Sequence, residues 1–160
     1  MDFGILLTFS NPQYRIPVTH LFETQLAQAV LAEELGYDHV WTAGHHGTDM
    51  YFPAQFPVLA ADGRVNDFMF EARERGIFFD LGHGAGSFWF RQAAPAVKGG
   101  FPPDTLSTDL HMANINGPVI SMLNTMNKFL AIGMPLGELI QRSTCLPAEL
   151  IDERISLCTG

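Results

Sequence analysis

Short apolar runs alternate with longer segments of helical periodicity along the chain, and this alternation predicts its elements. Phe3–Phe9 is a continuous apolar run, which indicates a strand buried on both faces, and His39–Thr42 is a second short run. Between them, apolar side chains recur mostly three to five positions apart, at Leu21, Phe22, Leu26, Val30, Leu31 and Leu35. This spacing predicts one helix that begins at Thr19 and is closed by Gly36. We therefore expect one parallel βαβ unit with a right-handed crossover.

The rest of the chain repeats the alternation after a loop over residues 43–66. The pattern predicts helices over 68–75, 88–97, 119–132 and 135–143, and strands over 77–81 and 105–108. Pro95 would shorten or kink the second of these helices, whereas Pro135 suits a helix start. Alternating strands and helices predict an α/β fold with a parallel sheet. About four parallel strands with flanking helices are too few to close a (β/α)₈ barrel, so we expect a partial TIM-barrel-like architecture.

Composition and charge narrow the classes of protein to which this chain can belong. Its 160 residues with 47% hydrophobic content provide enough apolar side chains for a packed core, so intrinsic disorder is not expected. A net charge of −8 repels phosphate backbones, which argues against a nucleic-acid partner. The two cysteines, Cys145 and Cys158, lack a CxxC spacing, which excludes a zinc ribbon and favours reduced thiols.

No segment has the pattern of a secretion signal or a membrane span. The apolar run after Met1 is too short for the core of a signal peptide, and no basic residue precedes it. No window approaches the roughly 20 apolar residues that a membrane helix needs. We therefore expect a soluble, cytoplasmic protein that does not bind membranes.

Two side chains that could bind a metal or move a proton follow predicted strands. His83 comes shortly after the strand that ends at Leu81, and Asp109 comes directly after the strand over 105–108. The carboxyl ends of parallel strands meet at one edge of a sheet, where α/β enzymes place their sites. Taken alone, a histidine between glycines is more often a loop residue than a functional one. The segment GHGAG at 82–86 is neither GxGxxG nor a P-loop, so we exclude nucleotide binding.

Residues 62–150 resemble the amidohydrolase/deacetylase family, which is related to dihydroorotase. The resemblance rests on short motifs in the family's order: DGRV at 62–65, FDLGHGAGSF at 79–88, STDLH at 107–111 and NINGP at 114–118. It implies a (β/α)₈ metallohydrolase that cleaves amide or cyclic amide C–N bonds in small molecules with a divalent metal, zinc being the expected ion. It further implies that His83 is a metal ligand, and that Asp109 is a ligand and the general base on the attacking water.

The number of implied ligands is smaller than a catalytic zinc site needs. Such a site uses about three protein ligands and a water, whereas the family's HxH pair, bridging lysine and further histidine belong to segments absent from this sequence. We therefore expect weak metal binding and an incomplete site that is weakly active or inactive. Polar residues after Asp109 are candidates for binding the amide substrate: His111, Asn114, Asn116 and Gly117. An Asx-rich turn is the alternative interpretation of this segment.

Residues 1–60 resemble another family, namely the start of the bacterial-luciferase-like flavin monooxygenases. The motifs are FGI at 3–5, AEELGYD at 32–38 and VW at 40–41, followed by the pair His45 and His46. The family usually has glutamate before this pair, where this chain has Gly44. The resemblance places His45 beside the flavin ring, but the family's phosphate-binding elements occur in later strands that are missing. We therefore expect no flavin binding, and a flavin-dependent monooxygenase fragment is the alternative function.

The two resemblances meet near Ala61 and Asp62, which indicates a chimera with one domain over residues 1–60 and another over 62–160. A third interpretation is a catalytically silent α/β fusion. In such a fusion, open strand edges would promote self-association, because an unpaired edge is a template for another chain.

Overall fold

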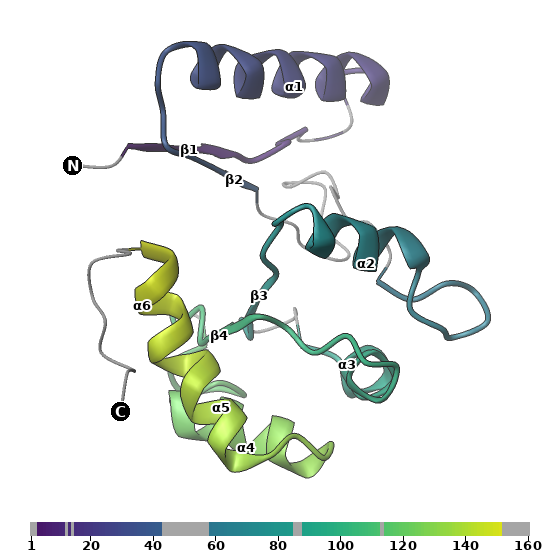
Figure 1. The fold of residues 1–160 in the computed structure, drawn as a ribbon, viewed down its shortest axis with the longest axis vertical. Helices are drawn as coiled ribbons and strands as arrows, with labels where there is room; N and C mark the ends of the chain where they lie inside the picture. Colours follow the sequence, from purple (N-terminus) through teal and green to yellow (C-terminus); the bar gives the residue numbers. More distant parts are fainter. Residues whose placement is uncertain are drawn as a thin grey trace. The chain divides into compact units, whose positions relative to one another are not determined.

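The computed structural model describes residues 3–11, 13, 15–42, 58–84, 88–112 and 114–151 (Figure 1). The chain forms two compact units, unit 1 over residues 1–56 and unit 2 over residues 57–160. Its elements are β1 (Gly4–Leu7), α1 (Val18–Glu34), β2 (His39–Thr42), α2 (Asp67–Glu74), β3 (Asp80–Gly82), α3 (Phe90–Lys98), β4 (Thr105–Ser107), α4 (Met122–Ala131), α5 (Leu136–Ser143) and α6 (Cys145–Ile151). The predicted α/β class with four parallel strands and flanking helices is confirmed.

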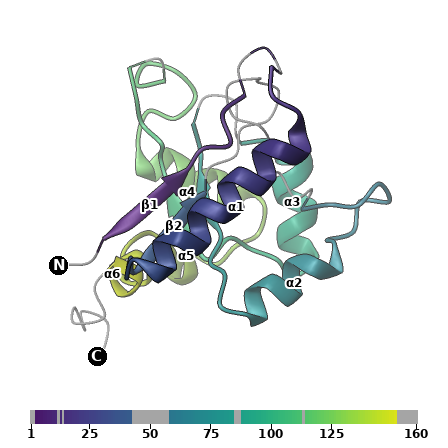
Figure 2. The same cartoon turned by 90° about the horizontal axis from the view of Figure 1, so that it is seen from above.

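Unit 1 is a βαβ unit, as the sequence predicts. β1 and β2 pair in parallel, with Gly4 opposite His39 and Leu7 opposite Thr42. Parallel neighbours need a crossover connection, and α1 supplies it by running alongside the strand pair (Figures 1 and 2). The core of the unit contains the buried residues Leu7, Phe9 and Leu21, against which Ile5, Phe22 and Ala29 pack.

The apolar face predicted for the first helix is only partly buried. Leu21 and Ala32 of α1 are buried, whereas four apolar side chains between the middle of the helix and its C-cap are more than half exposed: Leu26, Val30, Leu31 and Leu35. Two strands of four residues each are too short and too narrow to cover a helix of 17 residues. The expectation that β1 is buried on both faces is also wrong, because Leu6 is 60% exposed on the face that α1 does not cover.

In unit 2, α2 and α3 share a core with the turn that precedes α2. The buried residues of this core are Val65, Met69, Ala96 and Phe101. Arg73 of α2 lies beside this core. Its guanidinium is 3.8 Å from the centroid of the Phe101 ring, and its Nε is 3.1 Å from the Asp104 carboxylate. Asp104 also accepts a hydrogen bond from the Phe79 backbone N–H at 2.9 Å. This ion pair therefore connects α2 to the segments that enter β3 and β4.

β3 and β4 form the second parallel pair, with Gly82 opposite Ser107. The ladder continues beyond β3, because the His83 backbone N–H donates to the Ser107 carbonyl at 3.1 Å. The helices α4 and α5 cover one face of this pair. The buried core between them contains Leu106, Phe129, Met134 and Leu139, with Leu81 of β3 packed against it.

Two helices in unit 2 differ from what the sequence predicts. α3 runs through Pro95, and α4 begins at Met122 rather than at the predicted residue 119. The φ angle of Ile120 is 59°, which is outside the helical range and delays the start of α4. Ser121 then caps α4, because its side chain accepts a hydrogen bond from the Asn124 backbone N–H.

Two further differences concern segments at either end of unit 2. α6 was not predicted, and Cys145 at its start is disulfide-bonded, so the expectation of a reduced thiol is wrong for this residue. Sequence spacing can exclude a CxxC site, but it does not reveal which thiols meet in space. Residues 43–57 of the predicted loop lie outside the described residues, and after them Leu59 and Val65 form an isolated antiparallel bridge.

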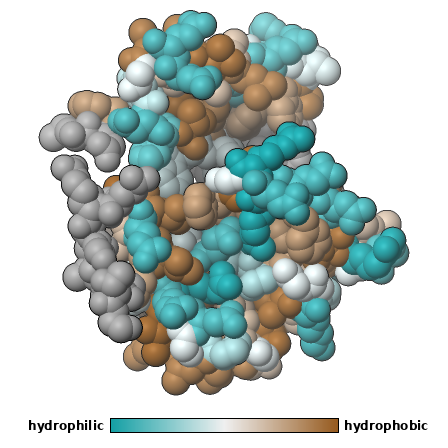
Figure 3. Space-filling model, viewed as in Figure 1, coloured by the Kyte–Doolittle hydropathy of each residue, from teal (hydrophilic) through white to brown (hydrophobic). Residues whose placement is uncertain are grey.

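Hydrophobic side chains reach the surface in both units, and Figure 3 shows them in brown among the hydrophilic residues. Each sheet has two strands, so the residues that the structure describes do not close a barrel. Within these same residues, no helix combines the length and apolar content that crossing a membrane requires.

Candidate functional site

The two faces of the β3–β4 pair differ in chemical character. One face packs Leu81 and Leu106 against the core beneath α4 and α5. On the other face, the Asp80 carboxylate accepts hydrogen bonds from the Thr105 hydroxyl at 2.7 Å and the Ser107 hydroxyl at 2.6 Å. Side chains alternate between faces along a strand, so every second residue contributes to this polar face.

Asp109 lies beyond the C-terminal end of β4, on the polar face. A Cβ placed on Gly82 would lie 3.3 Å from the Asp109 Cβ and 3.3 Å from the Ser107 Oγ. Gly82 therefore leaves space beside the Asp109 side chain, which is exposed. The φ angle of Asp109 is 46°, in the left-handed region that aspartate tolerates better than most residues. The Asn114 side-chain amide donates to the Asp109 carbonyl at 2.7 Å and holds this backbone in place.

His83 lies on the helix-covered face and is only 2% exposed. Its ring stacks on Phe88, with the centroids 5.0 Å apart and an interplanar angle of 9°. Its Nδ1 lies 2.6 Å from the Gly84 carbonyl oxygen, and its Nε2 lies 2.5 Å from the Lys128 Nζ. Both ring nitrogens are thus engaged by the protein itself.

Lys128 of α4 provides the positive charge at His83. Its Nζ also donates to the Pro118 carbonyl at 2.6 Å. Burial lowers the pKa of Lys128 below its usual value, because it penalises the charged ammonium form. The side chain connects three segments: the turn after β3, the end of the β4–α4 loop, and α4 itself.

The predicted pair of metal ligands is brought to one end of the strand pair but not to one face. His83 and Asp109 both follow parallel neighbouring strands, as expected. However, His83 points toward α4, whereas the Asp109 Cβ lies beside Gly82 on the opposite face. No group of three or more His, Cys, Asp and Glu side chains in the described part of the chain could hold a metal ion. The described residues therefore do not fit one metal ion bound jointly by His83 and Asp109.

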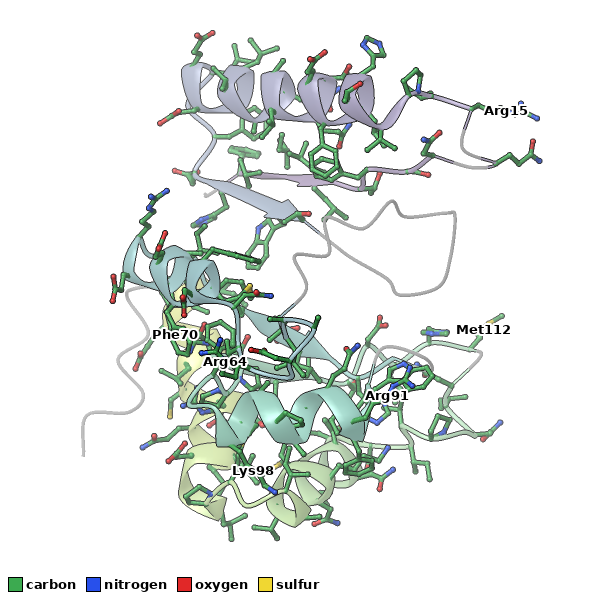
Figure 4. All side chains as sticks on the ribbon, turned by 90° about the vertical axis from the view of Figure 1, so that its right-hand side faces the viewer. Arg15, Arg64, Phe70, Arg91, Lys98 and Met112 are labelled. Carbon is green, nitrogen blue, oxygen red and sulfur yellow. The ribbon has the colours of Figure 1, made fainter. Side chains whose placement is uncertain are left out.

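The loop after Asp109 holds the residues predicted to bind substrate. Asn114 is fully buried, and besides its bond to Asp109 its side-chain oxygen accepts from the His111 backbone N–H at 2.8 Å. These two bonds match the alternative interpretation of an Asx-type turn for Asn114. His111 and Asn116 are exposed and Gly117 is half-buried, so a ligand can reach them. Met112, which is 96% exposed, projects from the same loop (Figure 4).

Two residues that shape this site were not predicted as site residues from the sequence, namely Lys128 and Asp80. The sequence contained a signal for Asp80. Residues two apart on a strand share a face, and Asp80 lies two residues before Gly82, beside which Asp109 lies. For Lys128, the sequence contained no signal of a contact with His83, because 45 residues separate the two side chains along the chain. His45, the flavin candidate, lies outside the described residues together with His46.

Comparisons with known proteins divide the chain in the same way as its motifs. Residues 1–63 match the family described as luciferase-like monooxygenase. A deacetylase from Enterococcus faecalis is 38% identical over 90 residues, which cover 56% of this chain and 24% of that protein. A deacetylase from Brucella anthropi is 42% identical over 76 residues, covering 48% of this chain and 19% of that protein.

The chain is similar to two enzyme families. Both resemblances inferred from the motifs are confirmed, the luciferase-like one in residues 1–63 and the deacetylase one in the rest. The chain spans only about a fifth to a quarter of the length of these curated deacetylases. The crystal structure of an adenine deaminase has the same fold, with a TM-score of 0.66 and 24% identity over 91% of this chain and 44% of that chain.

Proposed function

We propose that the deacetylase-like part of this chain belongs to a hydrolase that cleaves amide or cyclic amide C–N bonds in small molecules. The observation that carries the proposal is the position of Asp109. Its exposed carboxylate follows the C-terminal end of a parallel strand, on the polar face of the β3–β4 pair. Enzymes with this architecture place their catalytic side chains at this end of their strands. The similarity to two deacetylases supports hydrolysis of an acyl C–N bond as the reaction type.

In this reaction Asp109 acts as the general base. Its carboxylate takes a proton from a water molecule while the water oxygen forms a bond to the carbonyl carbon of the substrate. The C–N bond then breaks, and the proton passes to the departing nitrogen. Asp80 is unsuited to this role, because two hydroxyl groups already donate to its carboxylate. His111 and Asn116, both exposed on the loop after Asp109, are proposed to contact the substrate.

The expected cofactor of the family is a divalent metal, and zinc remains the predicted ion. The described residues do not bring His83 and Asp109 to one face, so they do not fit one ion held by both side chains. Of the two side chains, Asp109 is exposed on the polar face, whereas His83 is buried.

The proposal is tested by measuring amine release from a panel of N-acetylated amino acids and cyclic amides, using the full chain. Asp109→Asn keeps the size of the side chain but cannot accept a proton from water. We expect it to lower kcat/KM by at least about 100-fold, the usual contribution of a general base. Glu71→Gln is the matched control, because it neutralises an exposed carboxylate on α2 and should leave the rate unchanged. Equal rates for Asp109→Asn and the wild type would remove Asp109 from the mechanism, and no turnover of any amide would contradict the proposed reaction.

A second candidate function is flavin-dependent oxidation, which is favoured by the family match over residues 1–63. In this reading His45 would lie beside the flavin. The deacetylase-like function remains our proposal, and the exposed position of Asp109 beyond the end of β4 supports it.

A further inference from the structure

We infer that Lys128 acts as a built-in cation at Nε2 of His83, where it takes the place of a metal ion and keeps divalent metals from this histidine. The inference does not depend on the proposed hydrolysis. It rests on the two contacts of the His83 ring, on the burial of that ring, and on the second contact of the Lys128 ammonium group.

The contacts of His83 define its tautomer. A carbonyl oxygen can only accept a hydrogen bond, so the 2.6 Å contact with Gly84 requires that Nδ1 carries the proton. A neutral imidazole has one N–H, which leaves a lone pair on Nε2. This lone pair accepts a hydrogen bond from the Lys128 ammonium at 2.5 Å.

The same tautomer is the one that metal-binding histidines use. Such a histidine donates one ring N–H to a carbonyl or carboxylate, and its other nitrogen binds the ion through its lone pair. His83 thus has the outer hydrogen bond of a metal ligand, but Lys128 engages the lone pair that a metal would need. Helix α4 therefore supplies the Lys128 ammonium at Nε2 of His83, the ring nitrogen at which a metal ion was expected.

Two contacts hold the Lys128 ammonium at His83. Its Nζ is held from two sides, by the His83 ring and by the Pro118 carbonyl. The ring of Phe88 stacks on His83, and its centroid lies 5.8 Å from the same Nζ. A divalent cation that approached Nε2 would also be repelled by the ammonium charge at short range.

The experiment follows the side-chain signals of His83 in ¹H–¹⁵N spectra of the full chain while Co²⁺ is added. His83→Gln assigns these signals by their absence, so that the other histidines do not interfere. In the wild type we expect a protonated Nδ1, an unprotonated Nε2, and His83 signals that survive stoichiometric Co²⁺. In Lys128→Met, the Co²⁺ concentration that broadens the His83 signals to half should fall at least about tenfold, because both the repulsion and the competing donor are removed.

Two controls separate loss of the cation from loss of structure. Lys98→Met removes the only other lysine of the chain, which is exposed at the end of α3 (Figure 4), and should behave as the wild type. Lys128→Arg keeps a cation at the position and should retain most of the protection. A proton on Nε2 in the wild type, or equal broadening in the wild type and Lys128→Met, would overturn the inference. If Lys128→Met does not fold, the wild-type tautomer and the Lys128→Arg titration decide the question.

Discussion

Phe129 of α4 is fully buried in the core of unit 2 that also contains Leu106 of β4. Its ring packs edge-on against Phe88 at 5.4 Å, and Phe88 stacks on His83. Replacing it with alanine removes most of its apolar surface and leaves a cavity beneath the His83–Lys128 contact. We expect Phe129→Ala to lower the free energy of unfolding of unit 2 by about 3–5 kcal/mol.

Urea unfolding measures this change if one tryptophan reports on unit 2. The chain has two, so Trp41→Phe leaves Trp89 as the probe in every variant. Leu123→Ala is the control on the same helix, because Leu123 is 70% exposed and its loss should change the free energy by no more than about 0.5 kcal/mol. A Phe129→Ala midpoint equal to that of Leu123→Ala would show that this core does not stabilise the unit.

The sequence predicted at which end of the strand pair the site residues lie, but not on which face. Strand ends are visible in the sequence, so the shared end of His83 and Asp109 was predicted correctly. Their opposite faces were not predicted, although the alternation contained the information. Leu81 marks the apolar face two residues before His83, and Ser107 marks the polar face two residues before Asp109. The contact with Lys128 could not be predicted, because no local pattern links it to His83.

Among the elements, those with a strong periodic signal were predicted best. β2 has the predicted bounds, and α1 and α2 differ by about one residue from theirs. The misses have local causes, because Ile120 has a positive φ angle that periodicity does not reveal, and α6 follows α5 without a glycine or proline between them. The burial of α1 was overestimated, since an apolar stripe shows what a helix can bury and not what the protein places against it.

The prediction that the chain binds no flavin follows from the βαβ unit formed by β1, α1 and β2. The family match ends at residue 63, and the resemblance places the flavin-phosphate contacts of that family in later strands. The resemblance puts His45 beside the flavin ring, but residues 1–63 do not include the later strands that hold the phosphate in that family. We therefore expect the purified chain to be colourless and to show no saturable fluorescence quenching of added FMN. Saturable quenching that His45→Ala abolishes would favour the monooxygenase function instead.

For the whole molecule, the two units have separate cores and separate two-stranded sheets. In the sequence, the motifs of each family occur in one contiguous part of the chain. The sequence could not predict how well each unit covers its apolar surface, since burial depends on which elements are present to pack. Leu6 and Trp41 are opposite each other in the β1–β2 pair, and they are 60% and 50% exposed.

This surface leads to the prediction that the chain self-associates. Each sheet of the described residues has two strands, and strands without a further neighbour leave backbone N–H and C=O groups available for pairing with another copy. The exposed pair Leu6 and Trp41 adds apolar surface to one of these sheets, which a second copy could cover. Light scattering after size exclusion should give a mass above the 17.7 kDa of one chain, rising with protein concentration.

A charge on the exposed sheet face should weaken this association, as charges do on natural edge strands. We expect Leu6→Lys to shift the measured mass toward that of one chain. Leu35→Lys is the matched control, because it introduces the same charge at a leucine that is 67% exposed at the C-cap of α1 and belongs to neither strand. It should associate as the wild type does. A monodisperse 17.7 kDa wild-type species with a sharp, cooperative thermal transition would contradict the prediction, because it would mean that the open edges and apolar faces are covered within a single chain.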